Sequence, residues 1–308
     1  LHRVDRRQRQ MCIRDRHILD ANTEKLLTEA QDALSTPSNV YGMFSNADLE
    51  FEDAIDKDGQ AYPLTQGTFI KYLESDDREL RASAFRNVYK AYGAHNNTLG
   101  ATLAGEVKKN VFNARTHHYR SARERALSNN HIPEAVYDNL IKTVHKYLPL
   151  LHRYTKLRQE LLGLDDLKMY DLYTPLVKDV KFEMPYEEAK SWMLKALEPM
   201  GEEYLNVVKE GLDNRWVDVY ENKGKRSGGY SSGGHLTNPF ILLNWSDTVS
   251  DLYTLVHEFG HSAHSYFSRQ NQPSNLSDYT IFVAEVASTC NEACLLYTSD
   301  AADDLLCV

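Results

Sequence analysis

The stretch DTVSDLYTLVHEFGHSAHSYFS at residues 247–268 decides how the rest of the chain is interpreted. Its apolar residues recur at helical spacing, which predicts one amphipathic helix. At about 100° per residue, His257, His261 and His264 fall within an arc of about 60°. The apolar side chains occupy the opposite face: Leu252, Leu255, Val256, Phe259, Ala263, Tyr266 and Phe267. We therefore expect one face packed into a core and the other lined by histidines.

The pattern His257-Glu258-x-x-His261 within this helix has the spacing of a metal site. Histidines four residues apart lie about one turn apart, so both imidazoles can reach one zinc ion at about 2.0–2.1 Å. Glu258 lies beside them, where it can contact a water on the metal without ligating it. Three histidines and a carboxylate favour a metal site over an amphipathic helix with ordinary surface or core histidines. Gly260 indicates a close backbone approach, or it is incidental.

A catalytic zinc needs a third protein ligand and one open position. Glu285 is a candidate, because it lies among apolar residues in FVAEVAS (282–288), where an unpaired buried charge would be costly. Glu292 follows seven residues later on the same helical face and could accept a hydrogen bond from a ligand histidine. We place His264 in a similar supporting position. For Glu292, a solvent-facing carboxylate is the alternative.

Several blocks around this site resemble the thimet oligopeptidase and oligoendopeptidase F family of zinc metallopeptidases, the oligoendopeptidase F branch most closely. They are GKRSGGYSSGG (224–234), NPFILLNW (238–245), LVHEFGHSAHSYF (255–267) and FVAEVAST (282–289), and ESDDRELRASAFRNVYKAY (74–92) resembles the family's helical lobe. The resemblance implies a mostly α, zincin-like helical metallopeptidase, with a small β element before the HEFGH helix. It also implies a channel that admits short peptides.

The family's functional residues can be matched position by position. His257 and His261 match the ligating histidines, Glu258 the catalytic carboxylate and Glu285 the third ligand. The resemblance therefore implies one Zn²⁺ as cofactor, short peptides as substrates, and peptide-bond hydrolysis with Glu258 as general base.

The Gly-rich segment is informative only through the resemblance. Gly229 and Tyr230 match a strand edge near the substrate, whereas the segment taken alone would be an ordinary loop. A Gly-rich stretch can let a peptide backbone approach closely.

Other functions stay open at the level of sequence. In the family, further helices after the third ligand complete the channel, so we expect this chain to be a truncated piece. One alternative is thus a zinc-binding but inactive fragment, or a peptide-binding module. Another is a helical structural protein in which HEFGH is fortuitous.

Periodicity outlines the remaining elements and two parts of the chain. Helices are predicted over 22–34, 65–73, 77–94, 132–162, 185–197, 247–268 and 278–295, with one helix or a pair over 97–127, and strands over 216–220 and 240–245. We predict a helical lobe at 17–210 and the zinc-binding part of a catalytic domain at 211–295.

The two ends differ in kind from the rest. Residues 1–16 (LHRVDRRQRQMCIRDR) hold six Arg and no Lys, and residues 296–308 (LYTSDAADDLLCV) break off a helical pattern. Both resemble translated sequencing-adapter DNA, so we expect them to be non-native. A native basic arm and a native acidic tail are the alternative.

Composition sets the remaining limits. The net charge of −9 argues against a nucleic-acid partner. No apolar run approaches the roughly 20 residues that span a bilayer, so we expect no membrane partner. Four cysteines do not make a disulfide framework, which favours a cytoplasmic protein. We expect Cys290 and Cys294 to be buried small hydrophobic residues and not ligands.

Overall fold

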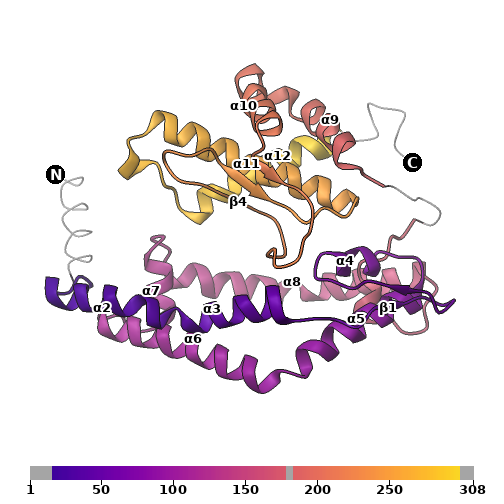
Figure 1. The fold of residues 1–308 in the computed structure, drawn as a ribbon, viewed down its shortest axis with the longest axis horizontal. Helices are drawn as coiled ribbons and strands as arrows, with labels where there is room; N and C mark the ends of the chain where they lie inside the picture. The colour runs from indigo at the N-terminus through magenta and orange to yellow at the C-terminus, as the bar shows by residue number, and fades with distance from the viewer. Residues whose placement is uncertain (1–15, 178–182, 299–308) are drawn as a thin grey trace. The chain divides into compact units, whose positions relative to one another are not determined.

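Helices form most of the computed structural model, which describes residues 16–177 and 183–298 (Figure 1). The predicted mostly α fold is confirmed. The supposed adapter segment at 1–16, apart from Arg16, lies outside the described residues, as do residues 299–308 of the supposed tail. Within the described ranges, no helix is both long enough and apolar enough to cross a membrane.

Contacts divide the chain into two compact units. The first contains residues 1–50 and 88–167, and the second contains residues 51–87 and 168–308. This division differs from the predicted boundary at residue 210. The reason lies in packing, because the helices just before that boundary pack on the helices that follow it.

The first unit consists of helices connected by short turns. Its elements are α2 (Ala21–Leu34), α3 (Thr36–Met43), the π-helical turn η1 (Phe44–Asp48), α6 (Asn96–Thr116), α7 (Ala122–Ser128) and α8 (Glu134–Leu161). The side chain of Asp20 caps α2 by accepting from the backbone N–H groups of Asn22 and Thr23. Helix α3 packs on α6 (Figure 1). The sequence did not predict α3, and it left open whether 97–127 forms one helix or two.

The second unit combines helices with two small sheets. Its elements are β1 (Ala54–Ile55), β2 (Ala61–Tyr62), α4 (Thr68–Leu73), the first turns of α5 (Arg78–Gly93), η2 (Met169–Asp171), α9 (Tyr186–Ala196), η3 (Glu198–Met200), α10 (Glu202–Asp213), β3 (Val217–Asp218), β4 (Tyr230–Ser232), β5 (Phe240–Leu242), α11 (Val249–Asn271), η4 (Ser274–Leu276) and α12 (Ile281–Thr298). The order of the three-stranded sheet is β3-β5-β4. Strand β4 runs antiparallel to β5 at one edge, with Tyr230 opposite Leu242.

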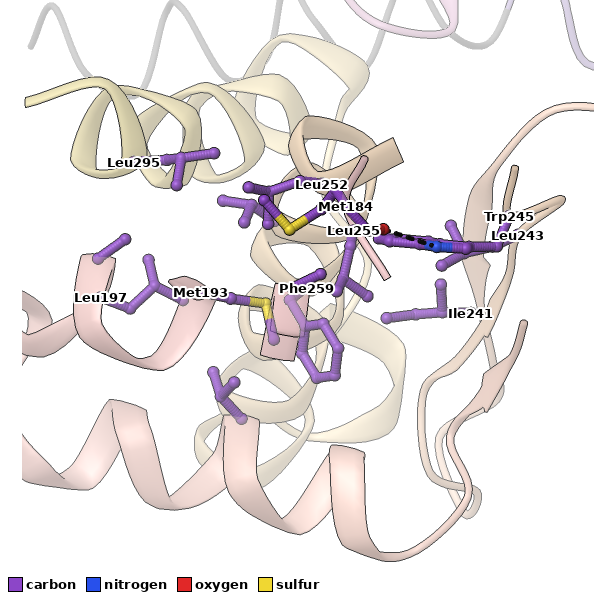
Figure 2. Close-up of a cluster of buried hydrophobic side chains, with 14 residues drawn as sticks. Met184, Met193, Leu197, Ile241, Leu243, Trp245, Leu252, Leu255, Phe259 and Leu295 are labelled. Carbon is purple, nitrogen blue, oxygen red and sulfur yellow. Dashed lines mark hydrogen bonds between the residues drawn. The ribbon is translucent and has the colours of Figure 1, made fainter. Parts of the chain in front are cut away.

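A hydrophobic core fixes α11 in this unit (Figure 2). Its buried residues are Met184, Ala189, Met193, Ala196, Leu197, Val208, Ile241, Leu243, Trp245, Leu252, Leu255, Val256, Phe259 and Leu295. They come from α9, α10, β5, α11 and α12 and from the residues that flank α9 and β5, so five elements and their flanking segments share one apolar centre. Trp245 Nε1 donates to the Met184 carbonyl oxygen at 3.2 Å, which satisfies the indole inside the core.

Local chemistry sets where α11 begins. Thr248 accepts a hydrogen bond from the Asp251 N–H, and Asp251 accepts one from the Thr248 N–H. This reciprocal capping box stabilises the first turn. The predicted helix over 247–268 therefore begins at the expected place, and it extends to Asn271.

Candidate metal centre

Helix α11 presents the two faces that its sequence predicts. Leu255, Val256 and Phe259 are at most 1% exposed and belong to the core. His257 and His261 are half-buried on the other face. Because the apolar face is fixed in the core, the histidine face has a defined direction.

Three donor atoms from two helices meet on that face. His257 Nε2 and His261 Nε2 lie 3.1 Å apart on α11. Glu285 Oε2, from α12, lies 3.5 Å from His257 Nε2 and 3.6 Å from His261 Nε2. In a tetrahedral zinc site with bonds of about 2.0–2.1 Å, donor atoms stand about 3.3–3.4 Å apart. The observed separations therefore fit a zinc ion held by these three residues.

The surroundings of Glu285 differ from the expectation. The sequence predicted a carboxylate buried among apolar residues, but the Glu285 side chain is 47% exposed. Its neighbours Phe282, Val283 and Val286 are also exposed, because this face of α12 points away from the core. Ser288 Oγ donates to Glu285 Oε2 at 2.9 Å and orients it. The expected burial of the Glu285 charge is therefore wrong, although the carboxylate lies beside the histidines as expected.

Both histidines have a hydrogen-bond partner behind them. Glu292 Oε1 lies 2.5 Å from His257 Nδ1, and the backbone of Ala284 hydrogen-bonds the His261 ring. A partner on one ring nitrogen leaves the other nitrogen available to a metal. Burial lowers the pKa of His261, which favours the neutral form that ligates metals.

His264 is the third histidine on this face of α11. Its ring stacks on Tyr279 with centroids 3.8 Å apart, and Tyr279 OH hydrogen-bonds Ser265 Oγ at 2.6 Å. In the part of the chain that the structure describes, the buried His264 Nδ1 has no hydrogen-bond partner. His264 therefore contacts the segment that leads into α12, and its supporting role at the donors stays a prediction.

Glu258 points inward, unlike the neighbouring donors. It is 5% exposed, and a backbone hydrogen bond from Ser231 reaches its carboxylate. Among the described residues, the buried Oε2 atom has no hydrogen-bond partner. Burial raises the pKa of Glu258, and the negative charge of Glu285 raises it further, while His257 acts in the opposite direction.

Gly260 permits the close crossing of α11 and α12. A Cβ atom at this position would lie 2.6 Å from Ser288 Cα and 2.8 Å from the Ala287 carbonyl oxygen. Real Cβ atoms do not approach backbone atoms this closely. A glycine in a helix interior costs about 1 kcal/mol relative to alanine, and here it brings Glu285 within reach of the histidines.

Strand β4 borders the same helix. Ser231 Oγ and Ser262 Oγ are 2.8 Å apart, and a Cβ atom on Gly229 would lie 2.7 Å from Thr254 Cγ2. Tyr230 is 39% exposed at the start of this edge strand. Tyr230, in a segment that would be a loop by sequence alone, thus begins an edge strand that packs on α11, and Gly229 directly precedes it.

Several side chains that support the site from behind were not predicted from the sequence. They are Tyr204, Ser231, Tyr279, Ser288 and Asn291. For Asn291 a signal existed, since an amide falls on the same helical face as Ala284 and Leu295. The two cysteines also differ from expectation, because Cys290 is exposed and Cys294 is only partly buried.

Comparisons with known proteins establish the family. The model of peptidase family M3 matches residues 71–303, and that of oligopeptidase F matches residues 9–51. The chain belongs to peptidase family M3.

Individual relatives agree with this assignment. The chain is 58% identical over 279 residues to oligopeptidase PepF of Bacillus subtilis, covering 91% of this chain and 42% of that protein. It is 49% identical to the group B oligopeptidase PepB of Streptococcus agalactiae, covering 92% of this chain and 47% of that protein. The crystal structure of oligoendopeptidase-F from Enterococcus faecium superposes with a TM-score of 0.62 at 37% identity, covering 97% of this chain and 47% of that one. The chain therefore spans less than half the length of these relatives.

Proposed function

We propose that this protein is a zinc-dependent metalloendopeptidase that hydrolyses short oligopeptides. His257, His261 and Glu285 would hold the zinc ion, and Glu258 would be the general base. The observation that carries the proposal is the meeting of three donor atoms from two helices at separations of 3.1–3.6 Å. Membership of peptidase family M3 supports the reaction class. Zinc binding is proposed for this chain, and turnover for the whole protein.

In the proposed hydrolysis, the zinc ion and Glu258 would have different roles. Zinc, when bound, would polarise the scissile carbonyl and lower the pKa of a water at its open position to about 7. Glu258 Oε2 can accept a proton from the attacking water and return it to the leaving amine. Because the Glu258 side chain is buried, bulk water has little access to this carboxylate. The backbone N–H of Ser231 donates a hydrogen bond that holds the carboxylate in place.

Strand β4 supports a way to bind the peptide. As an edge strand, β4 has backbone groups on the side that is not paired with β5, although the Ser231 N–H already donates to Glu258. An extended peptide can pair with such an edge, which aligns its backbone next to the metal-site helix. We propose that Gly229 and Tyr230 contact the substrate in this way, with Tyr230 as the exposed side chain.

Replacement of Glu258 by Gln tests this function. The variant should bind zinc as the wild type does and cleave an internally quenched fluorescent peptide at least about 10²-fold more slowly. Exposed Glu210 on α10 offers a matched control, since Glu210→Gln should change neither property. Wild-type cleavage by the Glu258 variant would show that another group is the base.

A second candidate is a zinc-binding chain that does not itself catalyse hydrolysis. The observation that favours it is the exposure of Glu285 together with the apolar face of α12, in a chain that spans less than half of its relatives. Wild-type chain that retains zinc and leaves the fluorescent peptide intact would support this candidate.

A further inference from the structure

Asn291 is a fully buried amide that connects three helices. The residue is 0% exposed on α12. Its Nδ2 atom donates to the Val256 carbonyl oxygen of α11 at 3.0 Å. Its Oδ1 atom accepts a hydrogen bond from the Tyr204 hydroxyl of α10 at 2.8 Å. Both ends of the amide are therefore satisfied, each by a different helix.

A polar group in this position is unfavourable unless its bonds are made. Burying an amide without partners costs free energy that an apolar side chain would not. Burial raises the pKa of Tyr204 to about 12, so its hydroxyl remains a donor at ordinary pH. If α12 slid along or rotated against α11, the amide would lose a partner. A buried polar residue can fix register between helices in this manner.

The bonds of Asn291 lie next to the candidate metal centre. Val256 directly precedes His257, and Asn291 directly precedes Glu292. Glu292 in turn contacts His257 Nδ1 at 2.5 Å. Two consecutive residues of α12 thus meet two consecutive residues of α11. Glu285 lies on the same helix, so its position depends on the same alignment.

We propose that Asn291 is a positioning residue that fixes the register of α12 on α11 and thereby holds Glu285 and Glu292 against the two histidines. The inference rests on the proposed zinc site. It assigns the alignment of the donors to a hydrogen-bonded amide that touches neither metal nor substrate. Tyr204 is part of the same device, because its hydroxyl determines which way the amide points.

The test is a double variant, Asn291→Leu with Tyr204→Phe, in the full chain. Removing both partners of a buried hydrogen bond is less harmful to folding than removing one, so the variant should stay folded while the polar register is lost. Its zinc dissociation constant, measured by competition with a chromophoric chelator, should rise about tenfold, at the low end of the effect of groups that support metal ligands. The visible spectrum of the Co²⁺-loaded chain should also change, because it reports donor geometry.

Leu295→Ala is the matched control. Leu295 is 2% exposed on the same helix, one turn beyond Asn291. This variant lowers stability through a cavity but keeps the amide pair, so its zinc affinity should change less than that of the double variant. Unchanged zinc affinity and an unchanged cobalt spectrum in the double variant would overturn the positioning role. Absence of zinc binding in the wild type is a separate result, which would instead overturn the proposed function.

Discussion

The two helices that bring the donors together are held in the molecule in different ways. Eight residues of α11 are buried, most of them apolar. Only three residues of α12 are buried, two of them polar, while Ile281, Phe282, Val283 and Val286 are exposed. Hydrophobic burial therefore fixes α11, whereas close approach at Gly260 and polar bonds fix α12. Changes at the polar and exposed positions of α12, unlike a change at the core residue Leu295, should affect the site before they affect the fold.

The largest expected difference concerns two phenylalanines. Phe259 of α11 is 1% exposed, so Phe259→Ala should lower the free energy of unfolding by about 3–5 kcal/mol. Phe282 of α12 is 60% exposed, so Phe282→Ala should change it by no more than about 0.5 kcal/mol. Urea unfolding followed by circular dichroism measures both. Equal losses would mean that α12 is as firmly packed as α11.

Zinc binding should reduce the difference between α11 and α12 in their protection from hydrogen exchange. At a zinc concentration 100 times the dissociation constant, binding stabilises the folded chain by about 2.7 kcal/mol. Because α11 is already held by the core, the added protection from hydrogen exchange should be greater in α12. Mass spectrometry of peptides from both helices, with zinc and with chelator, tests this. If zinc added more protection to α11 than to α12, α12 would not be the less firmly held helix.

Gly260→Ala should separate the helices. The new methyl group would clash with the backbone of Ala287 and Ser288, so we expect a loss of about 1–3 kcal/mol from overpacking and weaker zinc binding. Gly100 in α6 is a matched control, because a Cβ atom there meets nothing within 4 Å. Gly100→Ala should instead stabilise the chain by about 0.5–1 kcal/mol. Thermal unfolding and chelator competition distinguish the two outcomes.

The smallest expected effect is that of Ser288. Ser288→Ala removes the hydrogen bond to Glu285 Oε2 and should weaken zinc binding by about tenfold or less. Thr289 donates instead to the Glu285 backbone carbonyl, so Thr289→Ala should leave the affinity unchanged. A similar loss in both variants would show that helix stability, and not orientation of the carboxylate, is responsible.

Local patterns predicted α11 well, since its two faces and the spacing of His257 and His261 lie within one helix. The packing of α12 could not be predicted in the same way. Glu285 comes 28 residues after His257, and its exposure depends on which elements cover that helix. Gly260 within the helix indicated a close backbone approach. The short distance that a Cβ atom at this position would have to Ser288 Cα confirms it.

Short elements were harder to predict from sequence. The Gly-rich segment that contains β4 has little side-chain pattern, and it becomes a strand through pairing with β5. From the sequence, a polar residue such as Asn291 would not be expected in the core. It is buried because tertiary packing brings the Tyr204 hydroxyl and the Val256 carbonyl oxygen within hydrogen-bond distance of its amide. Such polar contacts are set by packing between helices, which periodicity alone does not show.

Zinc content, measured by elemental mass spectrometry on protein purified without added metal, tests the central claim most directly. We expect about one zinc ion per chain, because the three protein donors meet at a single point and form one site. His257→Ala should lose that zinc, although the core beneath α11 stays intact. A folded wild-type chain without zinc, or a His257 variant that keeps its zinc, would contradict the assignment of this metal centre.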